Sequence, residues 1–191
     1  MLRIIAGEYG GRRIKTLRGM RLRPTSDQLR ETLFNMIGEG IVGARFFDAY
    51  AGCGAVVIEA LSRGASHVTF IERHFPAVEC LRSNLLTLEI ESRFSIIQGD
   101  VGRSLLHQGE FDICFLDPPY AETQEYHTVL SALGSRINLM SHSLVIAEHS
   151  RRLKLPSSYG VLERVMEKIQ GDSQLSFYQP HSTNPEFRGQ S

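Results

Sequence analysis

The stretch that most constrains the fold is residues 111–120, with the sequence FDICFLDPPY. Its apolar run, from Ile113 to Leu116, does not alternate with polar residues, which is typical of a short strand covered on both faces of a sheet. Two prolines follow, and because proline has a fixed φ and no N–H, the strand cannot continue through them. The stretch therefore predicts a buried parallel strand that ends in a stiff loop.

That loop carries the candidate catalytic residues, because ligands of open α/β sheets bind at the carboxyl ends of the strands. The candidates are Asp117, Pro118, Pro119 and Tyr120. They offer a carboxylate acceptor, a carbonyl outside any strand ladder, a rigid turn and a flat ring. Together these groups could hold a planar molecule that carries an amine. Taken alone, the stretch also fits a strand followed by an ordinary loop, in which the prolines only end the strand.

The chain alternates strands with helices from residue 44 onward. Strands are expected at 46–50, 67–71, 94–97, 111–116 and 143–147, and helices at 55–63, 75–89 and 122–137. This alternation predicts an α/β fold with a mostly parallel sheet and right-handed crossovers. Two further segments, 161–169 and 175–178, surround Gly171-Asp172 and would close the sheet with a terminal antiparallel hairpin. The expected sheet then has seven strands.

Acidic residues stand at the predicted ends of three successive strands, at Asp48, Glu72 and Asp100. After the first of them, Gly52 and Gly54 allow the backbone to approach a ligand closely at a strand–helix turn. Glu72 is placed to accept hydrogen bonds from two ribose hydroxyls, and Asp100 could receive an adenine amine. Asp48 could order the glycine turn or engage a cationic amine through water. The pattern predicts a nucleoside-containing ligand at this edge of the sheet.

Among such ligands, the pattern favours S-adenosylmethionine over a dinucleotide. A dinucleotide-binding turn has the form GxGxxG, and here Val57 stands where the third glycine would be. A dinucleotide site also does not require the DPPY loop. The candidate cofactor-binding residues are Asp48, Ala49, Gly52, Gly54, Glu72, Arg73, Asp100 and Val101.

Residues 1–43 are expected to form a basic extension of the main domain at 44–180, and 181–191 a flexible tail. Short alternating runs separated by glycines indicate a hairpin, followed by a helix at 26–37 with Thr25 and Gln28 as a capping box. The first 45 residues hold nine Arg or Lys and four Asp or Glu, although the chain's net charge is zero. Such an asymmetry suggests contact with a polyanion, or a solvated basic face. The candidate contact residues are Arg12, Arg13, Arg18, Arg23 and Thr25.

Composition argues against several other classes. The three cysteines, Cys53, Cys80 and Cys114, are an odd number without CxxC spacing, which favours reduced thiols in the cytoplasm. The seven histidines lack zinc-ligand spacing, so no metal site is expected. No apolar run reaches the roughly 18 residues of a membrane helix, and basic residues interrupt the first 20 positions, where a signal peptide would be apolar.

The combination resembles a class I S-adenosylmethionine-dependent methyltransferase of the amino-group type. More closely, it resembles the RsmD family of bacterial enzymes that methylate N2 of a guanine in 16S ribosomal RNA. The matching segments are RIIAG at 3–7, RPT at 23–25, RE at 30–31, FN at 34–35, 48–54, EALSRGA at 59–65, Glu72, NL at 84–85 and 115–120. The DPPY loop is shared with many DNA and RNA enzymes, whereas RPT and EALSRGA are more specific to this family. The chain departs from the family pattern at Cys53, Val57 and Arg73-His74.

The resemblance implies a Rossmann-like class I fold, S-adenosylmethionine as methyl donor, and no metal. It implies a cytoplasmic enzyme, expected to be monomeric, whose substrate is one guanine of 16S rRNA (guanine 966 in the family) in an assembling or assembled 30S particle. Asp117 and the Pro118 carbonyl would accept the two N–H bonds of the amine, and Tyr120 would stack on the base. Two alternatives stay open: an adenine-N6 or glutamine-N5 methyltransferase, and a non-catalytic RNA-binding module.

Overall fold

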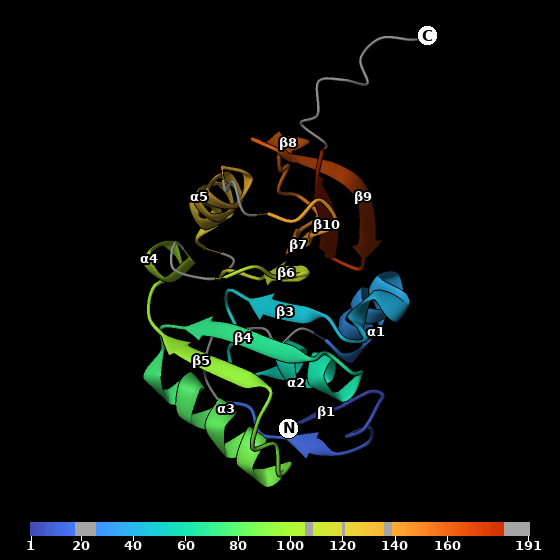
Figure 1. The fold of residues 1–191 in the computed structure, drawn as a ribbon, viewed down its shortest axis with the longest axis vertical. Coiled ribbons are helices and arrows are strands. Elements are labelled where there is room, and N and C mark those ends of the chain that lie inside the picture. The colour runs from blue at the N-terminus through green and yellow to red at the C-terminus, as the bar shows by residue number, and fades with distance from the viewer. Residues whose placement is uncertain (18–25, 106–108, 120, 136–138, 182–191) are drawn as a thin grey trace, which may run out of the picture.

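The computed structural model describes residues 1–17, 26–105, 109–119, 121–135 and 139–181. They form an eight-stranded, mostly parallel sheet with helices packed on both faces, and a separate two-stranded hairpin (Figure 1). This is the predicted Rossmann-like α/β architecture.

The large sheet has the spatial order β5, β4, β3, β6, β7, β10, β9, β8. In that order the strands are Phe94–Gln98, His67–Glu72, Arg45–Asp48, Ile113–Leu116, Leu144–Ser150, Ser173–Pro180, Leu162–Gln170 and Ser158–Tyr159. The strands from β5 to β7 pair in parallel, and β10 runs antiparallel between β7 and β9. All seven predicted strands are present, and β8 is an additional edge strand too short to show a periodic pattern.

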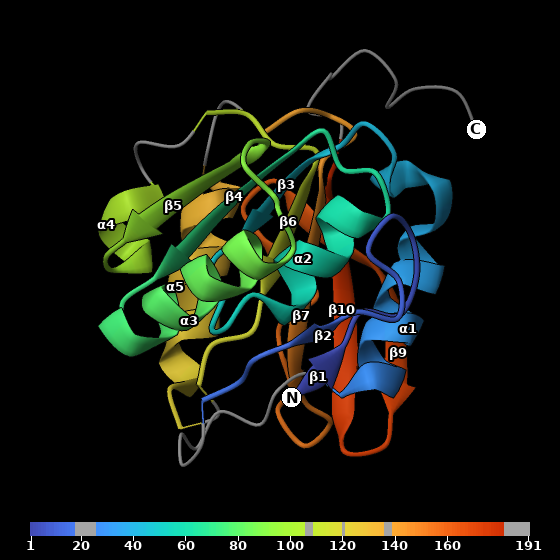
Figure 2. The same ribbon diagram turned by 90° about the horizontal axis from the view of Figure 1, so that it is seen from below.

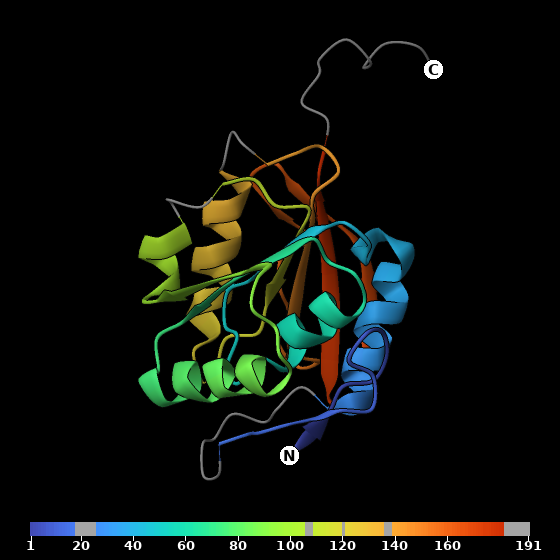
Figure 3. The same ribbon diagram turned by 60° about the horizontal axis from the view of Figure 1, so that its bottom comes forward.

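The helices are α1 (Asp27–Ile37), α2 (Ala55–Ser62), α3 (Phe75–Thr87), α4 (Val101–Leu105) and α5 (Thr123–Gly134), with a 3-10 turn, η1, at Gly38–Ile41. Figure 3 shows the sheet between α4 and α5 on one side and α1 and α2 on the other. Each face has its own apolar core, because successive strand residues point to opposite faces. Phe46 and Phe115 belong to the core shared with α1, α2 and α3, and Phe47 and Leu116 to the core shared with α4 and α5.

The N-terminal hairpin pairs β1 (Leu2–Arg3) with β2 (Arg13–Ile14) and lies beside α1 and α2 (Figure 2). The buried carboxylate of Glu59 in α2 accepts the backbone N–H groups of Ile5 and Ala6 at 2.8 and 3.1 Å. Three apolar residues of this segment, Ile4, Tyr9 and Ile14, belong to the same core as α1 and α2. The RIIAG and EALSRGA segments therefore bind each other, and the extension shares its core with the main domain.

Close packing explains one glycine of this contact. Gly7 has φ of +82°, and a Cβ on it would lie 1.8 Å from the Ser62 carbonyl oxygen. The Ser62 hydroxyl accepts the Tyr9 N–H at 2.9 Å and donates to the Ala6 carbonyl at 2.5 Å. A side chain at position 7 would separate the hairpin from α2.

The predicted helix cap needs a correction. Ser26 is the N-cap of α1, and its side chain accepts the N–H of Leu29 at 3.2 Å. Thr25 was expected in that role, but it lies outside the described residues. The capping-box pattern requires Glu or Gln three residues after the cap and therefore favoured Thr25, with Gln28, over Ser26, which is followed by Leu29 at that spacing. Ser26 instead caps the helix through its own side chain, without the reciprocal half of a capping box.

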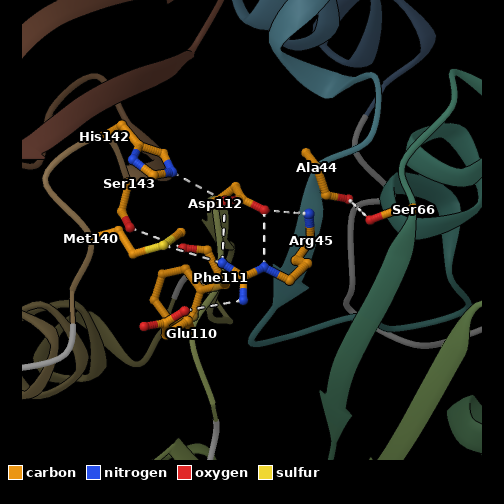
Figure 4. A network of polar contacts seen from close by, with 9 residues as sticks. All are labelled: Ala44, Arg45, Ser66, Glu110, Phe111, Asp112, Met140, His142 and Ser143. Carbon is orange, nitrogen blue, oxygen red and sulfur yellow. Dashed lines mark hydrogen bonds and ion pairs between the residues drawn. The ribbon is translucent and has the colours of Figure 1, made fainter.

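The amino ends of β3 and β6 are joined by a polar network (Figure 4). Asp112 accepts the backbone N–H of Arg45 at 2.7 Å and its Nε–H at 3.2 Å, and His142 lies 3.3 Å from the other carboxylate oxygen. Glu110 pairs with the same guanidinium at 3.3 Å. Burial alone would raise the pKa of Asp112, but the hydrogen bonds from Arg45 and His142 outweigh burial and lower that pKa. The network is therefore a fully paired junction between two central strands.

Candidate active site

A cavity of about 320 Å³ lies at the carboxyl ends of β3, β4 and β6. Seven of the eight predicted cofactor-binding residues line it, together with Asp117 and Pro119. The seven are Asp48, Ala49, Gly52, Glu72, Arg73, Asp100 and Val101. Parallel strands bring their carboxyl ends to one edge, which is why acids far apart in the sequence meet there.

The loop after β3 is held open by its neighbours. The Ala49 N–H donates to the Phe115 carbonyl at 3.0 Å, and the Ala51 N–H donates to the Ile71 carbonyl at 3.1 Å. These two bonds fasten the loop to β6 on one side and to β4 on the other. The loop is thus fixed between β4 and β6, and its residues 49–52 line the cavity.

The two glycines of this loop have different tasks. Gly52 has φ of +54° and lines the cavity. Gly54 has φ of +87°, and a Cβ on it would lie 2.0 Å from Leu81 Cδ1 of α3. Gly54 was expected to contact the cofactor, but it does not line the cavity; it permits close packing of the loop on α3.

Glu72 ends β4 with its carboxylate held by backbone donors. Its Oε2 accepts the Gly52 N–H at 2.9 Å, and its Oε1 accepts the His74 N–H at 2.7 Å. Each carboxylate oxygen can accept a second hydrogen bond. Glu72 therefore has one acceptor position left on each oxygen, which is the requirement for gripping a pair of ribose hydroxyls.

Asp48 ends β3 and is 1% exposed. Its Oδ1 accepts the Tyr50 N–H at 3.0 Å. Burial raises the pKa of Asp48 to about 7, and the nearby carboxylates of Glu72 and Glu148 add to this effect, whereas the Tyr50 hydrogen bond opposes it. A cation placed in the cavity would favour the ionised form of this group.

Asp100 is exposed at the start of α4, where it accepts the Arg103 N–H at 3.4 Å, and Val101 beside it is buried. Arg73 pairs with Glu122, and this hydrogen bond is the main reason why the pKa of Arg73 is raised. Because Arg73 follows β4 and Glu122 follows the DPPY segment, the pair connects the predicted donor side of the cavity with the predicted acceptor side.

The DPPY segment leaves the sheet next to this pair. Asp117 and Pro119 are half-buried and line the cavity, whereas Pro118 is buried and does not. The Pro119 carbonyl accepts the Glu122 N–H at 2.7 Å in a tight turn. Within the described part of the chain, the Pro118 carbonyl accepts no hydrogen bond. Tyr120 lies outside the described residues.

Several cavity residues carried no signal in the sequence. Leu2, Thr16 and Leu17 reach the cavity because the N-terminal hairpin docks against α2 and α3. Tyr50 also lines it and donates its hydroxyl to Glu125 Oε2 at 2.8 Å; burial and this bond raise the pKa of Tyr50. The position of Tyr50 directly after a strand-end acid could have identified it, whereas the hairpin residues could not have been found from local pattern.

Asn84 of α3 ties three of these parts together. Its side-chain oxygen accepts the Lys15 N–H at 2.8 Å, and its side-chain nitrogen donates to the carbonyls of Lys15 and Cys53, both at 3.0 Å. One buried amide thus links the hairpin, the donor loop and α3. This contact explains why the NL segment belongs with the other motifs.

The predicted polyanion contacts divide into two groups. Arg12 donates to the Thr87 and Leu88 carbonyls at 2.6 and 3.4 Å, at the end of α3, where a cation also interacts favourably with the helix dipole. Arg13 is exposed on β2. The remaining three candidates, Arg18, Arg23 and Thr25, lie outside the described residues.

Among the described residues, no cluster of side chains suits a metal ion, and no helix is long and apolar enough to cross a membrane.

Comparison with known proteins adds the family context. Residues 2–179 match the family model described as conserved hypothetical protein 95. The chain is 36% identical to YlbH of Bacillus subtilis over 93% of this chain and 98% of YlbH. It is 32% identical to ribosomal RNA small subunit methyltransferase D of Escherichia coli, over 93% of this chain and 89% of that protein.

Two solved structures share the fold. The Escherichia coli protein yhhF has a TM-score of 0.83 and 32% identity, with 94% of this chain and 98% of that chain covered. An RNA methyltransferase from Salinibacter ruber, solved in complex with S-adenosyl-L-homocysteine, has a TM-score of 0.64 and 14% identity over 87% of this chain and 99% of that chain. The second likeness is one of fold alone.

Proposed function

The chain belongs to the RsmD family of methyltransferases, and on this premise we propose that it transfers a methyl group from S-adenosylmethionine to N2 of a guanine in 16S rRNA. In the family this is guanine 966. One observation carries the proposal: Asp117 of the DPPY loop lines the same cavity as Glu72 and Asp48 of the donor side. An amine acceptor and a methyl donor can therefore meet in one cavity.

On the donor side, Glu72 binds the ribose hydroxyls and Asp100 receives the adenine amine. Asp48 lies between these groups and the DPPY loop, where it faces the positive charge of the donor. Binding a cation beside a buried carboxylate offsets the cost of ionising it. The donor thus supplies a positive charge beside Asp48, whose carboxylate accepts the Tyr50 backbone N–H and lies near the carboxylates of Glu72 and Glu148.

On the acceptor side, the target base leaves its stack and enters the cavity beside Asp117. Guanine N2 is a poor nucleophile because its lone pair is delocalised into the ring. Asp117 and the Pro118 carbonyl accept its two N–H bonds, aim the lone pair at the donor methyl, and stabilise the positive charge that develops on nitrogen. Preorganised acceptors of this kind are worth several kcal/mol, and holding both reactants in line supplies much of the remainder. Tyr120 stacks on the base.

After transfer, the S–CH₃ bond is broken and an N–CH₃ bond is formed, and the nitrogen loses one proton to solvent or through Asp117. No covalent enzyme intermediate is required. The DPP segment suits this chemistry because a proline-rich turn cannot shift its carbonyl into a strand ladder.

The test incubates labelled S-adenosylmethionine with naked 16S rRNA, 30S particles and duplex DNA, followed by digestion and identification of the labelled nucleoside. We expect N2-methylguanosine in the rRNA. Label in N6-methyladenine would show instead that the chain is an adenine methyltransferase. Absence of transfer to any of the three, with S-adenosylmethionine bound, would reject the nucleic-acid assignment.

The basic extension at 1–43 would hold the RNA, with 44–180 as the catalytic domain. Arg13 is the cleanest probe because it is exposed, whereas Arg12 also caps α3. Arg13→Glu should weaken binding of 16S rRNA and lower the slope of affinity against salt by about one ion. Donor affinity should stay as in the wild type, and a parallel loss of both affinities would contradict a role in RNA binding.

A further inference from the structure

Glu148 lies near the end of β7, next to the proposed acceptor site. Leu116 of β6 pairs with Ala147 of β7, so Glu148 and Asp117 each stand one residue beyond this pair on neighbouring parallel strands. Phe115 and Ile146, two residues earlier on each strand, are also partners, and both belong to the core on the α1 side of the sheet. By strand alternation, Glu148 faces that same side.

The neighbouring residue does not share this position. His149 has both ring nitrogens engaged, one 2.9 Å from the Ser150 carbonyl and one 2.8 Å from the Ser176 hydroxyl. Alternation turns it to the opposite face from Glu148. Glu148 is therefore the acid at the end of β7 that faces the α1 side with Asp48.

The Glu148 side chain borders a second cavity, of about 90 Å³. Glu148 is 4% exposed, and its Oε1 accepts the Ser173 hydroxyl at 3.4 Å. The other lining residues are Ser26, Gln28 and Leu29 of the α1 start and Gln170, Gly171, Asp172 and Ser173 of the β9–β10 turn. The lining is mostly polar. This cavity shares no lining residue with the cavity of about 320 Å³, and the link between Glu148 and the acceptor site is its register beside Asp117 at the ends of β7 and β6.

Guanine and adenine differ most on the edge that such a group would meet. Guanine carries an N1–H donor directly beside its N2 amine, whereas N1 of adenine is an acceptor. A carboxyl oxygen accepts the N1–H of guanine and repels the lone pair on N1 of adenine. Enzymes that act on flipped bases identify them through hydrogen bonds to this edge. The DPPY loop binds an amine and does not make this distinction.

We propose that Glu148 is the guanine-selecting residue, which accepts the N1–H of the target base while Asp117 and Pro118 hold its N2 amine. This proposal rests on the proposed guanine-N2 function. It assigns the N1–H of the target base to the Glu148 carboxylate at the end of β7, next to Asp117 on the neighbouring strand. The neighbouring carboxyls then have separate tasks: Glu148 selects the base, Asp117 positions the amine, and Asp48 faces the donor.

The test uses a 16S rRNA prepared by splinted ligation with either guanine or 2-aminopurine at the methylated position. 2-Aminopurine keeps the amine but has no N1–H, and its N1 is an acceptor as in adenine. The wild type should methylate the guanine substrate with a kcat/KM on the order of 100-fold higher or more, because a buried acceptor left unpaired is costly. In Glu148→Gln, whose amide can also donate, the ratio should fall to about tenfold or less.

A matched control is Glu163→Gln, an acid-to-amide change at an exposed position of β9 that does not line the cavity. It should keep the wild-type ratio. Equal use of guanine and 2-aminopurine by the wild type would overturn the role of Glu148 but not the proposed function. So would a Glu148→Gln protein with lower activity on both substrates and an unchanged ratio, which indicates a structural residue. Failure of the wild type to methylate guanine N2 would instead reject the proposed function.

Discussion

The strands β3 and β6 have an aspartate at each end of the pair, and the surroundings of the two aspartates shift their pKa values in opposite directions. At the amino ends of β3 and β6, Asp112 is paired with Arg45 and His142, and its pKa is lowered. At the carboxyl end of β3, Asp48 is buried beside other carboxylates, and its pKa is raised to about 7. Both acids stand at ends of the central strands, yet Asp112 pairs with basic side chains, whereas Asp48 lies near other carboxylates.

The difference separates a structural end of the sheet from the end at which we propose the active site. Charges that stabilise a fold are paired within it, whereas a site for a cationic ligand keeps a carboxylate for which the ligand is the partner. Substitutions of the acids at the two ends of these strands should therefore have different consequences. Changes at Asp112 should affect stability, and changes at Asp117 and Asp48 should affect catalysis and donor binding.

The largest effect is expected for Asp117→Ala. Loss of the acceptor for the amine should lower kcat on the order of 100- to 1,000-fold, because an acceptor aimed at developing charge is removed. The Kd for S-adenosylmethionine should change little. Transfer of label from the radiolabelled donor measures kcat, and calorimetry measures Kd. Near-normal methylation by a variant that binds the donor normally would remove Asp117 from the mechanism.

The opposite end should show the opposite behaviour. Asp112→Ala should lower the free energy of unfolding by about 2 kcal/mol, since several donors lose one acceptor, and the Tm by roughly 4–8 °C. The folded protein should keep its kcat. Glu110→Ala serves as the control, because Glu110 is an exposed partner of the same Arg45 and should cost less than about 0.5 kcal/mol.

The same change has a predicted pH dependence. A lowered pKa in the folded state means that Asp112 stabilises the protein above its unfolded pKa of about 4, and that this contribution is lost as pH falls through the folded pKa. Wild type and Asp112→Ala should therefore converge in stability toward low pH. Denaturant titrations at pH 7 and pH 3 measure this, and an equal gap at both would contradict the assigned pairing.

A third substitution, Asp48→Asn, tests the same contrast through the pH dependence of donor affinity. A cationic donor favours ionised Asp48, so donor affinity should rise up to about tenfold per pH unit toward pH 7 and level off above it. Asp48→Asn should flatten this profile.

In the ligand-free protein the raised pKa makes Asp48 destabilising as pH rises through about 7, so Asp48→Asn should have the higher Tm at pH 8. Calorimetry from pH 5.5 to 8.5 measures the first effect, and a flat wild-type profile would refute it.

The smallest effect is expected at Cys53, one of the positions at which the sequence departs from the expected family pattern. The loop is held through the Cys53 carbonyl, which accepts the Asn84 amide at 3.0 Å. Burial and the neighbouring Cys53 raise the pKa of Cys80 to about 12. A serine at position 53 keeps a hydrogen-bonding group of similar size beside Cys80. Cys53→Ser should change stability by less than about 0.5 kcal/mol and leave donor affinity nearly unchanged. A large loss of donor affinity would show that the thiol itself contacts the donor.

Much of the fold and part of the site could be predicted from the sequence, because the information is local. Apolar periodicity located the strands and helices, and glycines and prolines located the turns. Acids at Asp48, Glu72 and Asp100 marked the strand ends, and the parallel arrangement placed them at one edge. Of the expected functional loop at 117–120, Asp117 and Pro119 reach the cavity.

The partners of these residues could be known only from the tertiary structure, because they come from distant parts of the chain. Glu59 binds the backbone at Ile5, 54 residues away, and Arg12 caps a helix 75 residues away. The packing role of Gly54 and the burial of Asp48 near other carboxylates follow from such contacts. Sequence pattern fixes where an acid stands on its strand. Which charges surround it, and therefore its pKa and chemistry, depends on how the strands and helices assemble.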